Sequence, residues 1–587
     1  MASTSTLDVD TSDSVNDTKK NLSLVFGPDK PELLIRSLGS LVEEQASTFG
    51  TRCAVSVPWQ STRLSYQDLA DRSKLMAEAM LQMGLQHGDC VGIMAGNCYQ
   101  YLEVFLGGSR IGCPVVVINN TFAPDELEAA VCRVNCKLLF VASSIGTRSL
   151  KGHVERLLHL PPEAHLTRLV TIGSVRAKAP NSVKLQSYDD FLLESRSKGS
   201  TGIALKQAQS QVVPSDVLNL QFTSGTTGLP KAASLTHTNL INNARFTGHA
   251  MRLTKDDVVC CPPPLFHCFG LVMGFLASFC YGSTVVFPSD NFDAQRTIDA
   301  VVQEKATALL GVPTMFISEL DVLEANPVKI STVRTGLAAG SPVPKVLMES
   351  LRKQMNIQGM LIAYGMTETS PVTFITSLDD TEEKMHNSIG RVFPHTGAKV
   401  IDTSGNVVPI GQRGELCTSG FALQKGYWHD EAKTQEVMKE DENGILWMHT
   451  GDEGFIDEDG YGHITGRIKD IIIRGGENIS PNEIENRLLA HPSIAESCVV
   501  GLADYKYGEV VSCFLKSANG STQRPSDDQV RDWVREHLGR VKSPQHIFWI
   551  GDEGIGSGLP KTGSGKYQKH LIRDIGNALL KRQRSKL

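Results

Sequence analysis

Short, wholly apolar segments alternate with helical patterns through the first part of this chain. Residues 90–94, 114–118 and 138–141 are almost entirely apolar, and residues 99–107 and 125–134 between them have the spacing of amphipathic helices. A strand that is apolar on both faces is typical of a parallel sheet covered by helices on both sides. We therefore expect an α/β fold with a parallel sheet at this end of the chain.

The length of 587 residues exceeds what one hydrophobic core supports, so more than one domain is expected. A Gly- and Asp-rich hairpin at residues 451–463 precedes the clearest boundary, near residue 467. The segment after it is long enough for a small α+β domain. The residues therefore predict a disordered arm at the start, a large first domain that ends near residue 466, and a small α+β domain after it.

Composition excludes several classes of protein. A formal net charge of −6 gives the chain no general attraction for nucleic acid. The 13 cysteines are scattered, which favours free thiols in a reducing, intracellular compartment. The first 22 residues contain no apolar stretch and thus no signal peptide. The most apolar run, residues 265–281, is short for a bilayer, so we expect a buried helix beside a cavity and no transmembrane segment.

A loop rich in glycine and hydroxyl groups follows the apolar residues 217–222. Polyphosphate binding needs flexible backbone, free N–H groups, hydroxyl donors and a cation, and this loop supplies all four. It lacks the spacing of a Walker loop. A plain surface loop is the alternative. The candidate phosphate-binding residues are Thr223, Ser224, Gly225, Thr226, Thr227, Gly228 and Lys231.

This loop resembles the signature of the adenylate-forming superfamily, which contains acyl-CoA synthetases, adenylation domains of peptide synthetases and firefly-type luciferases. Further motifs match in the family's order, over about residues 35 to 575: Arg334-Thr-Gly-Leu-Ala-Ala-Gly-Ser-Pro342, Tyr364-Gly-Met-Thr-Glu-Thr369, Thr450-Gly-Asp452, Gly466-Arg-Ile-Lys-Asp-Ile-Ile-Ile-Arg-Gly-Gly-Glu-Asn478 and Pro560-Lys-Thr-Gly-Ser-Gly-Lys566. Any one motif is weak evidence, but all of them in order are strong evidence.

The resemblance implies a finer domain division: a disordered arm and lead-in at 1–34, a large N-terminal domain with layered sheets and a β subdomain at 35–466, a hinge at 467–470, a mobile α+β C-terminal domain at 471–580, and a basic tail at 581–587.

The resemblance also implies an acid:CoA ligase that uses ATP, Mg²⁺ and coenzyme A. It would form an acyl-adenylate from a carboxylic acid and ATP, and then an acyl-CoA thioester. Glu368 would bind magnesium, since a hard cation requires carboxylate oxygen. Lys566 would neutralise the two anions that meet in the first step. The implied ATP-binding set also contains Ala339, Gly340, Ser341, Tyr364, Gly365, Met366, Thr367, Asp452 and Arg467.

Each assignment has a simpler alternative. Glu368 could be a solvated loop carboxylate. Asp452 could be a turn aspartate rather than a ribose ligand. Lys566 could be no more than a solvated lysine in a Gly-rich turn, as such lysines usually are. The neighbouring lysines Lys561 and Lys569 are the alternatives to it.

The apolar run offers a wall for the acid, and the hinge motif a site for coenzyme A. By resemblance, His267 lies near the reacting carboxylate, although a lone His is more often a core residue. Lys469 matches the hinge position. The predicted acid pocket consists of His267, Gly270, Val272, Met273, Val312, Thr314 and Ala338. The predicted coenzyme A site consists of Arg474, Gly475 and Gly476, where the glycines would lie next to the pantetheine tunnel or simply form a tight turn.

The predicted pocket carries no carboxylate that could pair with an α-ammonium, so a short- or medium-chain fatty acid or a related hydroxy acid is expected. The chain most resembles medium-chain acyl-CoA synthetases, through the segment 264–267. Three alternatives stay open: an aryl or hydroxy-acid ligase of secondary metabolism, a free-standing adenylation domain that serves a carrier protein, and a non-catalytic member of the family. The sequence does not indicate an oligomeric state.

The chain ends in Ser585, Lys586 and Leu587, the peroxisomal import tripeptide, with basic residues just upstream. A solvated basic tail is the alternative. Because acyl-CoA is consumed in peroxisomes, we expect a peroxisomal matrix enzyme that binds the import receptor.

Overall fold

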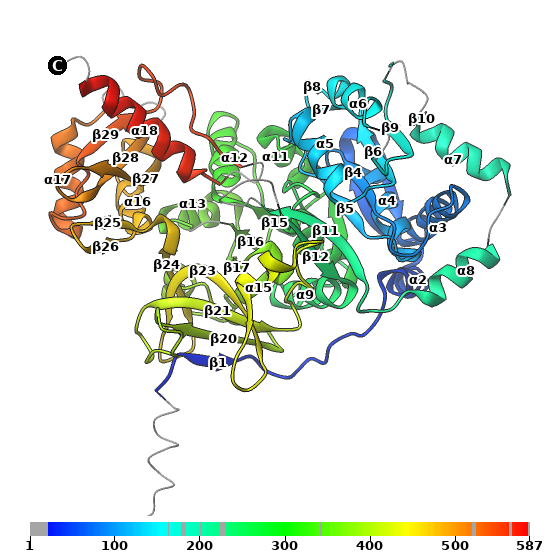
Figure 1. Cartoon of the computed structure of the whole chain (residues 1–587), viewed down its shortest axis with the longest axis horizontal. Helices are drawn as coiled ribbons and strands as arrows, with labels where there is room; N and C mark the ends of the chain where they lie inside the picture. The colour runs from blue at the N-terminus through cyan, green and yellow to red at the C-terminus, as the bar shows by residue number, and fades with distance from the viewer. Residues whose placement is uncertain are drawn as a thin grey trace, which may run out of the picture.

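The structure is a computed structural model of the chain. It describes residues 21–161, 164–175, 177, 183–199, 202–223, 231–340, 343–518, 524–562 and 566–584. Layered sheets and helices form the larger part of the molecule, and a smaller C-terminal domain, orange to red in Figure 1, lies above the yellow β subdomain. Among the helices in the described ranges, none is both long enough and apolar enough to cross a membrane.

The first sheet contains the predicted apolar strands. Its order is β10-β9-β6-β4-β5-β11-β12, parallel throughout except for the pairing of β11 with β12. The bounds are β4 Val91–Met94, β5 Val115–Val117, β6 Leu138–Ala142, β9 Arg168–Ile172, β10 Lys184–Ser187, β11 Val217–Thr223 and β12 Lys231–Thr236. The parallel sheet expected from the sequence is therefore confirmed.

Helices cover this sheet. Ser65 caps α3 in a capping box with Asp68, which fixes where the helix begins. The helices of this region are α2 Leu38–Phe49, α3 Tyr66–Gln82, α4 Tyr99–Arg110, α5 Pro124–Arg133, α6 Lys151–Leu158, α7 Tyr188–Ser197 and α8 Gly202–Gln211, and a small hairpin joins β7 Ser144–Ile145 to β8 Arg148–Ser149.

A second, mixed sheet has the order β19-β18-β17-β16-β15-β13-β14-β2-β3. Its strands are β2 Cys53–Val57, β3 Thr62–Ser65, β13 Val258–Cys260, β14 Thr284–Val286, β15 Ala308–Gly311, β16 Thr335–Ala339, β17 Gly359–Gly365, β18 Val372–Ile375 and β19 Arg391–Val392. Helices that accompany it are α9 His237–Ala250, α11 Ala294–Gln303, α12 Pro313–Ala325, α13 Lys345–Met355 and α14 Glu382–Asn387. One hydrophobic cluster contains residues of both sheets, so the two layers share a core.

The apolar run 265–281 is buried, as expected, but it is not one α-helix. A loop precedes η2 Phe269–Leu276, which is a π-helix, and α10 Ala277–Cys280 follows. Asn97 holds this loop, because its side chain donates to the Pro263 carbonyl at 3.0 Å and accepts from the Leu265 N–H at 2.8 Å. The irregular backbone replaces the first turns of the expected helix.

The β subdomain and the C-terminal domain complete the chain. The subdomain contains β1 Leu24–Phe26, β20 Thr396–Ile401, β21 Gly414–Gly420, α15 Glu431–Val437, β22 Met438–Glu440, β23 Leu446–Ile456 and β24 Gly462–Arg467. The C-terminal domain follows η4 Ile468–Asp470 and contains β25 Ile472–Arg474, β26 Glu477–Ile479, α16 Pro481–Leu489, β27 Ile494–Asp504, β28 Gly508–Ser517, α17 Asp527–Leu538, β29 His546–Trp549 and α18 Lys569–Arg584.

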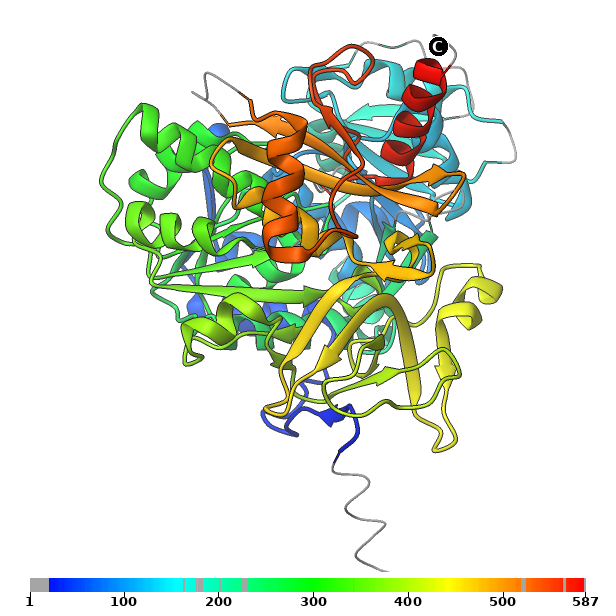
Figure 2. The same cartoon turned by 90° about the vertical axis from the view of Figure 1, so that its left-hand side faces the viewer.

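The C-terminal domain has hydrophobic clusters of its own. Both consist of residues from Ile472 onward. Its sheet, of order β26-β25-β28-β27 with β29 against β28, is likewise separate from the others. Figure 2, in which this domain faces the viewer, shows it above the yellow strands of the subdomain. A domain that packs its own core can change its orientation without unfolding.

Candidate active site

Glu368 lies at the centre of the site. It belongs to η3 (Thr367–Thr369), directly after β17, and is 6% exposed. Its Oε1 accepts a hydrogen bond from the Tyr427 hydroxyl at 2.8 Å, and its backbone carbonyl accepts from the Gln424 N–H at 2.8 Å. A carboxylate accepts about four hydrogen bonds or metal ligations, so the bond from Tyr427 leaves capacity for a hard cation. Glu368 therefore fits the predicted role of a magnesium ligand.

Tyr427 was not predicted from the sequence. Its ring lies 4.9 Å from the Lys231 ammonium in a cation–π contact, so one tyrosine joins the last residue of the phosphate loop to Glu368. Backbone pairing fixes it there, because the Trp428 N–H donates to the Ala232 carbonyl at 2.8 Å. A tyrosine without a motif gives no signal in a single sequence.

Asp452 is the second buried carboxylate, 7% exposed, on β23. Its Oδ2 accepts from the Tyr364 hydroxyl at 2.6 Å, and its Oδ1 lies 3.1 Å from Nε of Arg467 on β24. The carboxylate of Asp452 raises the pKa of Arg467. The structure thus brings together three residues of separate predicted nucleotide motifs, in an arrangement that suits a ribose diol.

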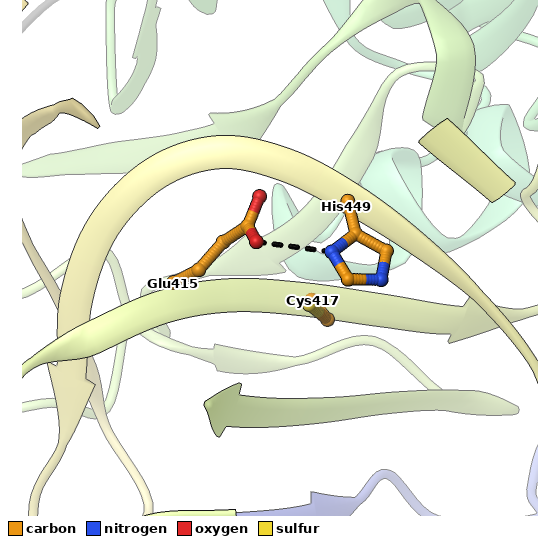
Figure 3. A group of neighbouring side chains, drawn as sticks. All are labelled: Glu415, Cys417 and His449. Atoms are coloured by element: carbon orange, nitrogen blue, oxygen red, sulfur yellow. Dashed lines mark hydrogen bonds and ion pairs between the residues drawn. The ribbon is translucent and has the colours of Figure 1, made fainter. Parts of the chain in front are cut away.

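A further pair of side chains holds the irregular part of β23 that carries Asp452. Glu415 on β21 accepts from the Gly451 N–H at 3.1 Å and lies 2.9 Å from Nδ1 of His449 (Figure 3). Gly451 has a φ of +71°, which favours glycine. Burial acts to raise the pKa of Glu415, but the hydrogen bonds from His449 and from the Gly451 N–H outweigh it and lower the pKa. This pair could not be predicted from the sequence, because nothing in the motif Thr450-Gly-Asp452 points to β21.

Glu415, Cys417 and His449 also form a group of metal-ligand type, with ligand atoms within 4.8 Å of one another. Lys399 and Lys439 lie near enough to lower the pKa of the Cys417 thiol, although burial raises it more. Two ammonium groups beside three ligands disfavour a dication. We therefore assign this group to support of the irregular part of β23.

Lys566 reaches the site from the C-terminal domain. A Cβ on Gly340 would lie 3.6 Å from its Cε, which places the lysine beside the predicted adenine-side loop. Burial of the ammonium and the nearby Arg467 lower the pKa of Lys566, while Asp452 and Glu368 act in the opposite direction. The residue as a whole keeps exposed surface. The C-terminal domain therefore has the orientation in which the lysine meets the nucleotide-binding residues.

The residues of the predicted acid pocket differ in burial and surroundings. His267 lies in the loop before η2, and burial followed by the charge of Lys566 lowers its pKa to about 4, so its ring is neutral near pH 7. Gly270 is required there, because a Cβ would lie 2.4 Å from the Pro264 carbonyl oxygen. Val312 lies beside Gly340, and Thr314 is exposed at the start of α12. The residues Gly270, Val272, Met273 and Ala338 are buried.

The structure does not bring the predicted coenzyme A residues to Lys566. Gly475 and Gly476 both have positive φ, and a Cβ on Gly476 would meet nothing within 4 Å. The guanidinium of Arg474 lies 4.5 Å from the Tyr507 ring, within the C-terminal domain. Lys469, the predicted hinge residue, lies in η4 between the two domains.

Several predicted residues lie outside the described part of the chain. They are Ser224, Gly225, Thr226, Thr227 and Gly228 of the phosphate loop, Ser341 of the adenine-side loop, and Ser585, Lys586 and Leu587 at the end. The flanking residues Thr223, Lys231, Ala339 and Gly340 lie at the ends of β11, β12 and β16, and Thr367, Gly365 and Met366 lie around the turn after β17.

Two family models match the chain: "AMP-binding enzyme" over residues 42–428 and "AMP-binding enzyme C-terminal domain" over residues 483–566. The chain is 46% identical to the acyl-CoA ligase sidI of Beauveria bassiana, over 96% of each protein. It is 32% identical to the mitochondrial medium-chain acyl-CoA ligase ACSF2 of Bos taurus, over 92% of this chain and 87% of the relative.

The solved structure of an anthranilate CoA ligase, AuaEII, in complex with anthranoyl-AMP has the same fold, with a TM-score of 0.80 and 22% identity over 94% of this chain and 98% of that one.

Proposed function

This chain belongs to the AMP-binding enzyme family and is an ATP-dependent, AMP-forming acid:CoA ligase, and from that premise we propose that its substrate is a largely apolar short- or medium-chain monocarboxylic acid. The observation that carries the residue assignments is the position of Lys566, which extends from the C-terminal domain to within 3.6 Å of a Cβ on Gly340 in the N-terminal domain. We infer that Lys566, Glu368 and Asp452 supply one cation and two carboxylates to a bound nucleotide.

In the first half-reaction, a carboxylate oxygen of the acid attacks the α-phosphorus of ATP. The bond from that phosphorus to pyrophosphate breaks, and pyrophosphate leaves with the electron pair. Lys566 lies where it can neutralise the approaching carboxylate and the α-phosphate, which is the largest electrostatic cost of the step. Asp452 holds the ribose. Glu368 would hold Mg²⁺, which supplies charge neutralisation for the departing pyrophosphate.

In the second half-reaction, the thiol of coenzyme A loses its proton to solvent and its sulfur attacks the acyl carbon. The bond from this carbon to the AMP oxygen breaks, and AMP leaves with the electron pair. Gly475 and Gly476 lie away from the nucleotide residues in the orientation that the structure shows. We therefore propose that the C-terminal domain turns about Lys469 between the two half-reactions, which brings the glycines to the pantetheine tunnel.

The acid class rests on the wall of the predicted pocket. Residues 266–279 contain no carboxylate. A buried α-ammonium without a partner costs several kcal/mol, whereas each buried methylene contributes about 0.8 kcal/mol. We expect ATP–pyrophosphate exchange with octanoate to exceed exchange with 2-aminooctanoate by at least about 100-fold. Preference for the amino acid would overturn the proposed substrate class.

A hydroxy acid is a second candidate, and one observation favours it. The Nε2 of Gln221 is buried with no hydrogen-bond partner among the described residues, while its Oε1 accepts from the Cys268 thiol at 3.0 Å. A substrate hydroxyl could accept from this amide. Comparing octanoate with hydroxyoctanoates, in the native enzyme and in Gln221→Leu, tests the candidate: a preference for a hydroxy acid that the substitution removes would support it.

We also propose that the enzyme acts in the peroxisomal matrix, through recognition of Ser585, Lys586 and Leu587 by the import receptor. The support is the tripeptide itself and the consumption of acyl-CoA in that compartment. Deleting the three residues should move a fluorescent fusion to the cytosol and leave activity unchanged. Continued import of the truncated protein would show that another signal is responsible.

A further inference from the structure

One carboxylate in the C-terminal domain contacts three donors at once. Glu496 lies on β27, and its side chain is 23% exposed. Its Oε2 is 2.7 Å from the Lys561 ammonium and accepts a hydrogen bond from the Tyr567 hydroxyl at 2.7 Å. Its Oε1 accepts from the Lys516 ammonium at 2.8 Å. Burial would raise the pKa of Glu496, but the hydrogen bonds from these donors outweigh it and lower the pKa to about 2.

Two of these donors stand at the base of the loop that carries Lys566. Lys561 and Tyr567 form an antiparallel bridge. Between them, the Thr562 N–H donates to the Lys566 carbonyl at 2.7 Å, and the Lys566 N–H donates to Oγ1 of Thr562 at 3.1 Å. The same oxygen of one carboxylate therefore contacts both sides of the hairpin, and Tyr567 directly follows the catalytic lysine.

We propose that Glu496 is a positioning residue for the adenylation step: it attaches the Lys566 hairpin to β27, so that the orientation of the C-terminal domain sets the place of the ammonium. The inference rests on the proposed role of Lys566. A Gly-rich loop without such an anchor would sample many positions, and each misplacement weakens a charge interaction that acts only at short range.

The third donor separates this role from ordinary stabilisation of the sheet. Lys516 lies opposite Glu496 in the β27–β28 register, on the neighbouring strand rather than on the hairpin. Removing the Lys516 ammonium removes the cross-strand ion pair between Lys516 and Glu496. The Lys516 side chain is 49% exposed, so this ion pair contributes little to stability. Lys516→Met is therefore a matched control that keeps the hairpin attached through Lys561 and Tyr567.

The test measures the two half-reactions separately in the full-length enzyme. For Glu496→Ala and the milder Glu496→Gln, we expect pyrophosphate exchange to fall about 10- to 100-fold, with Glu496→Ala the more affected. Transfer to coenzyme A from pre-made acyl-AMP should stay within about twofold of the native rate. Since transfer requires a folded enzyme, it also reports whether each variant folds.

Lys516→Met should retain native rates in both half-reactions. Equal loss of both half-reactions in the Glu496 variants, or native exchange in them, would overturn the inference. The Lys566→Ala enzyme should show no further loss of exchange when Glu496→Gln is added, because both act through one group. If Lys566→Ala itself keeps native exchange, the proposed function fails; if only the Glu496 variants keep it, the positioning role alone fails.

Discussion

The two walls of the site are held in different ways. On the N-terminal side, Glu368 and Asp452 are almost completely buried, and each accepts a tyrosine hydroxyl from its own domain. On the C-terminal side, Lys566 lies between Lys561 and Tyr567 in the chain, and both of these residues contact Glu496 of the same domain. The acceptors are thus fixed before substrate binds, whereas the cation is delivered by a domain with its own core. Fixed acceptors can hold the nucleotide through both steps, first as ATP and then as the acyl-adenylate, and a movable cation can leave when the second step begins.

The largest test of this difference is Lys566→Ala. The cation is needed only while two anions approach, so pyrophosphate exchange should fall by at least about 100-fold, and thioester formation from pre-made acyl-AMP should remain. Lys581→Ala removes an exposed lysine of the same domain and serves as the control. Exchange near the native rate would mean that Lys566 takes no part in adenylate formation.

Gly476→Leu should have the opposite effect. In the orientation shown, a Cβ at Gly476 meets no atom of the described residues within 4 Å, so exchange should survive, while transfer to coenzyme A should fall about 10- to 100-fold because the side chain fills the tunnel after rotation. Gly539→Leu is the matched control, since Gly539 also has a positive φ, +79°, and open surroundings. Equal loss of both half-reactions in Gly476→Leu, or an equal effect of the control, would show backbone strain instead.

Tyr427→Phe tests how Glu368 is held on the N-terminal side of the site. Losing the hydroxyl removes a hydrogen bond to a charged carboxylate, which corresponds to about a tenfold fall in exchange efficiency, measured as kcat/KM for magnesium ATP. Tyr461→Phe is the control, because the Tyr461 hydroxyl also donates to a carboxylate, that of Asp380 at 2.6 Å, away from the site. An unchanged kcat/KM in Tyr427→Phe would mean that Glu368 needs no support from this residue.

The smallest expected effect is a shift in the titration of His267. Burial lowers its pKa first, and the charge of Lys566 lowers it further. Removing that charge in Lys566→Ala should therefore raise the pKa of His267, which burial still keeps below its ordinary value of about 6.5. NMR titration of the imidazole measures the shift. An unchanged pKa would show that the lysine does not reach His267 in solution.

Much of the scaffold was predictable because it depends on local pattern. The apolar strands at 90–94 and 138–141, the capping box at Ser65 and the hairpin before residue 467 all follow from neighbouring residues in the chain. The order of the motifs likewise gave the candidates Glu368, Asp452 and Lys566. The irregular start of the run 265–281 was missed, since the loop before the π-helix is held by Asn97, far away in the sequence.

The sequence by itself determined the family, the α/β class and which ionisable groups are candidates for the chemistry, because these depend on residue types at short spacing. Only the tertiary structure decided which groups hold the candidates in place: Tyr427 for Glu368, Glu415 for the part of β23 that carries Asp452, and Glu496 for the Lys566 hairpin. It also decided that Lys566, rather than Gly476, faces the nucleotide residues. The physical reason is that hydrogen bonds and charge interactions act over a few ångströms in space, whatever the separation of their partners along the chain.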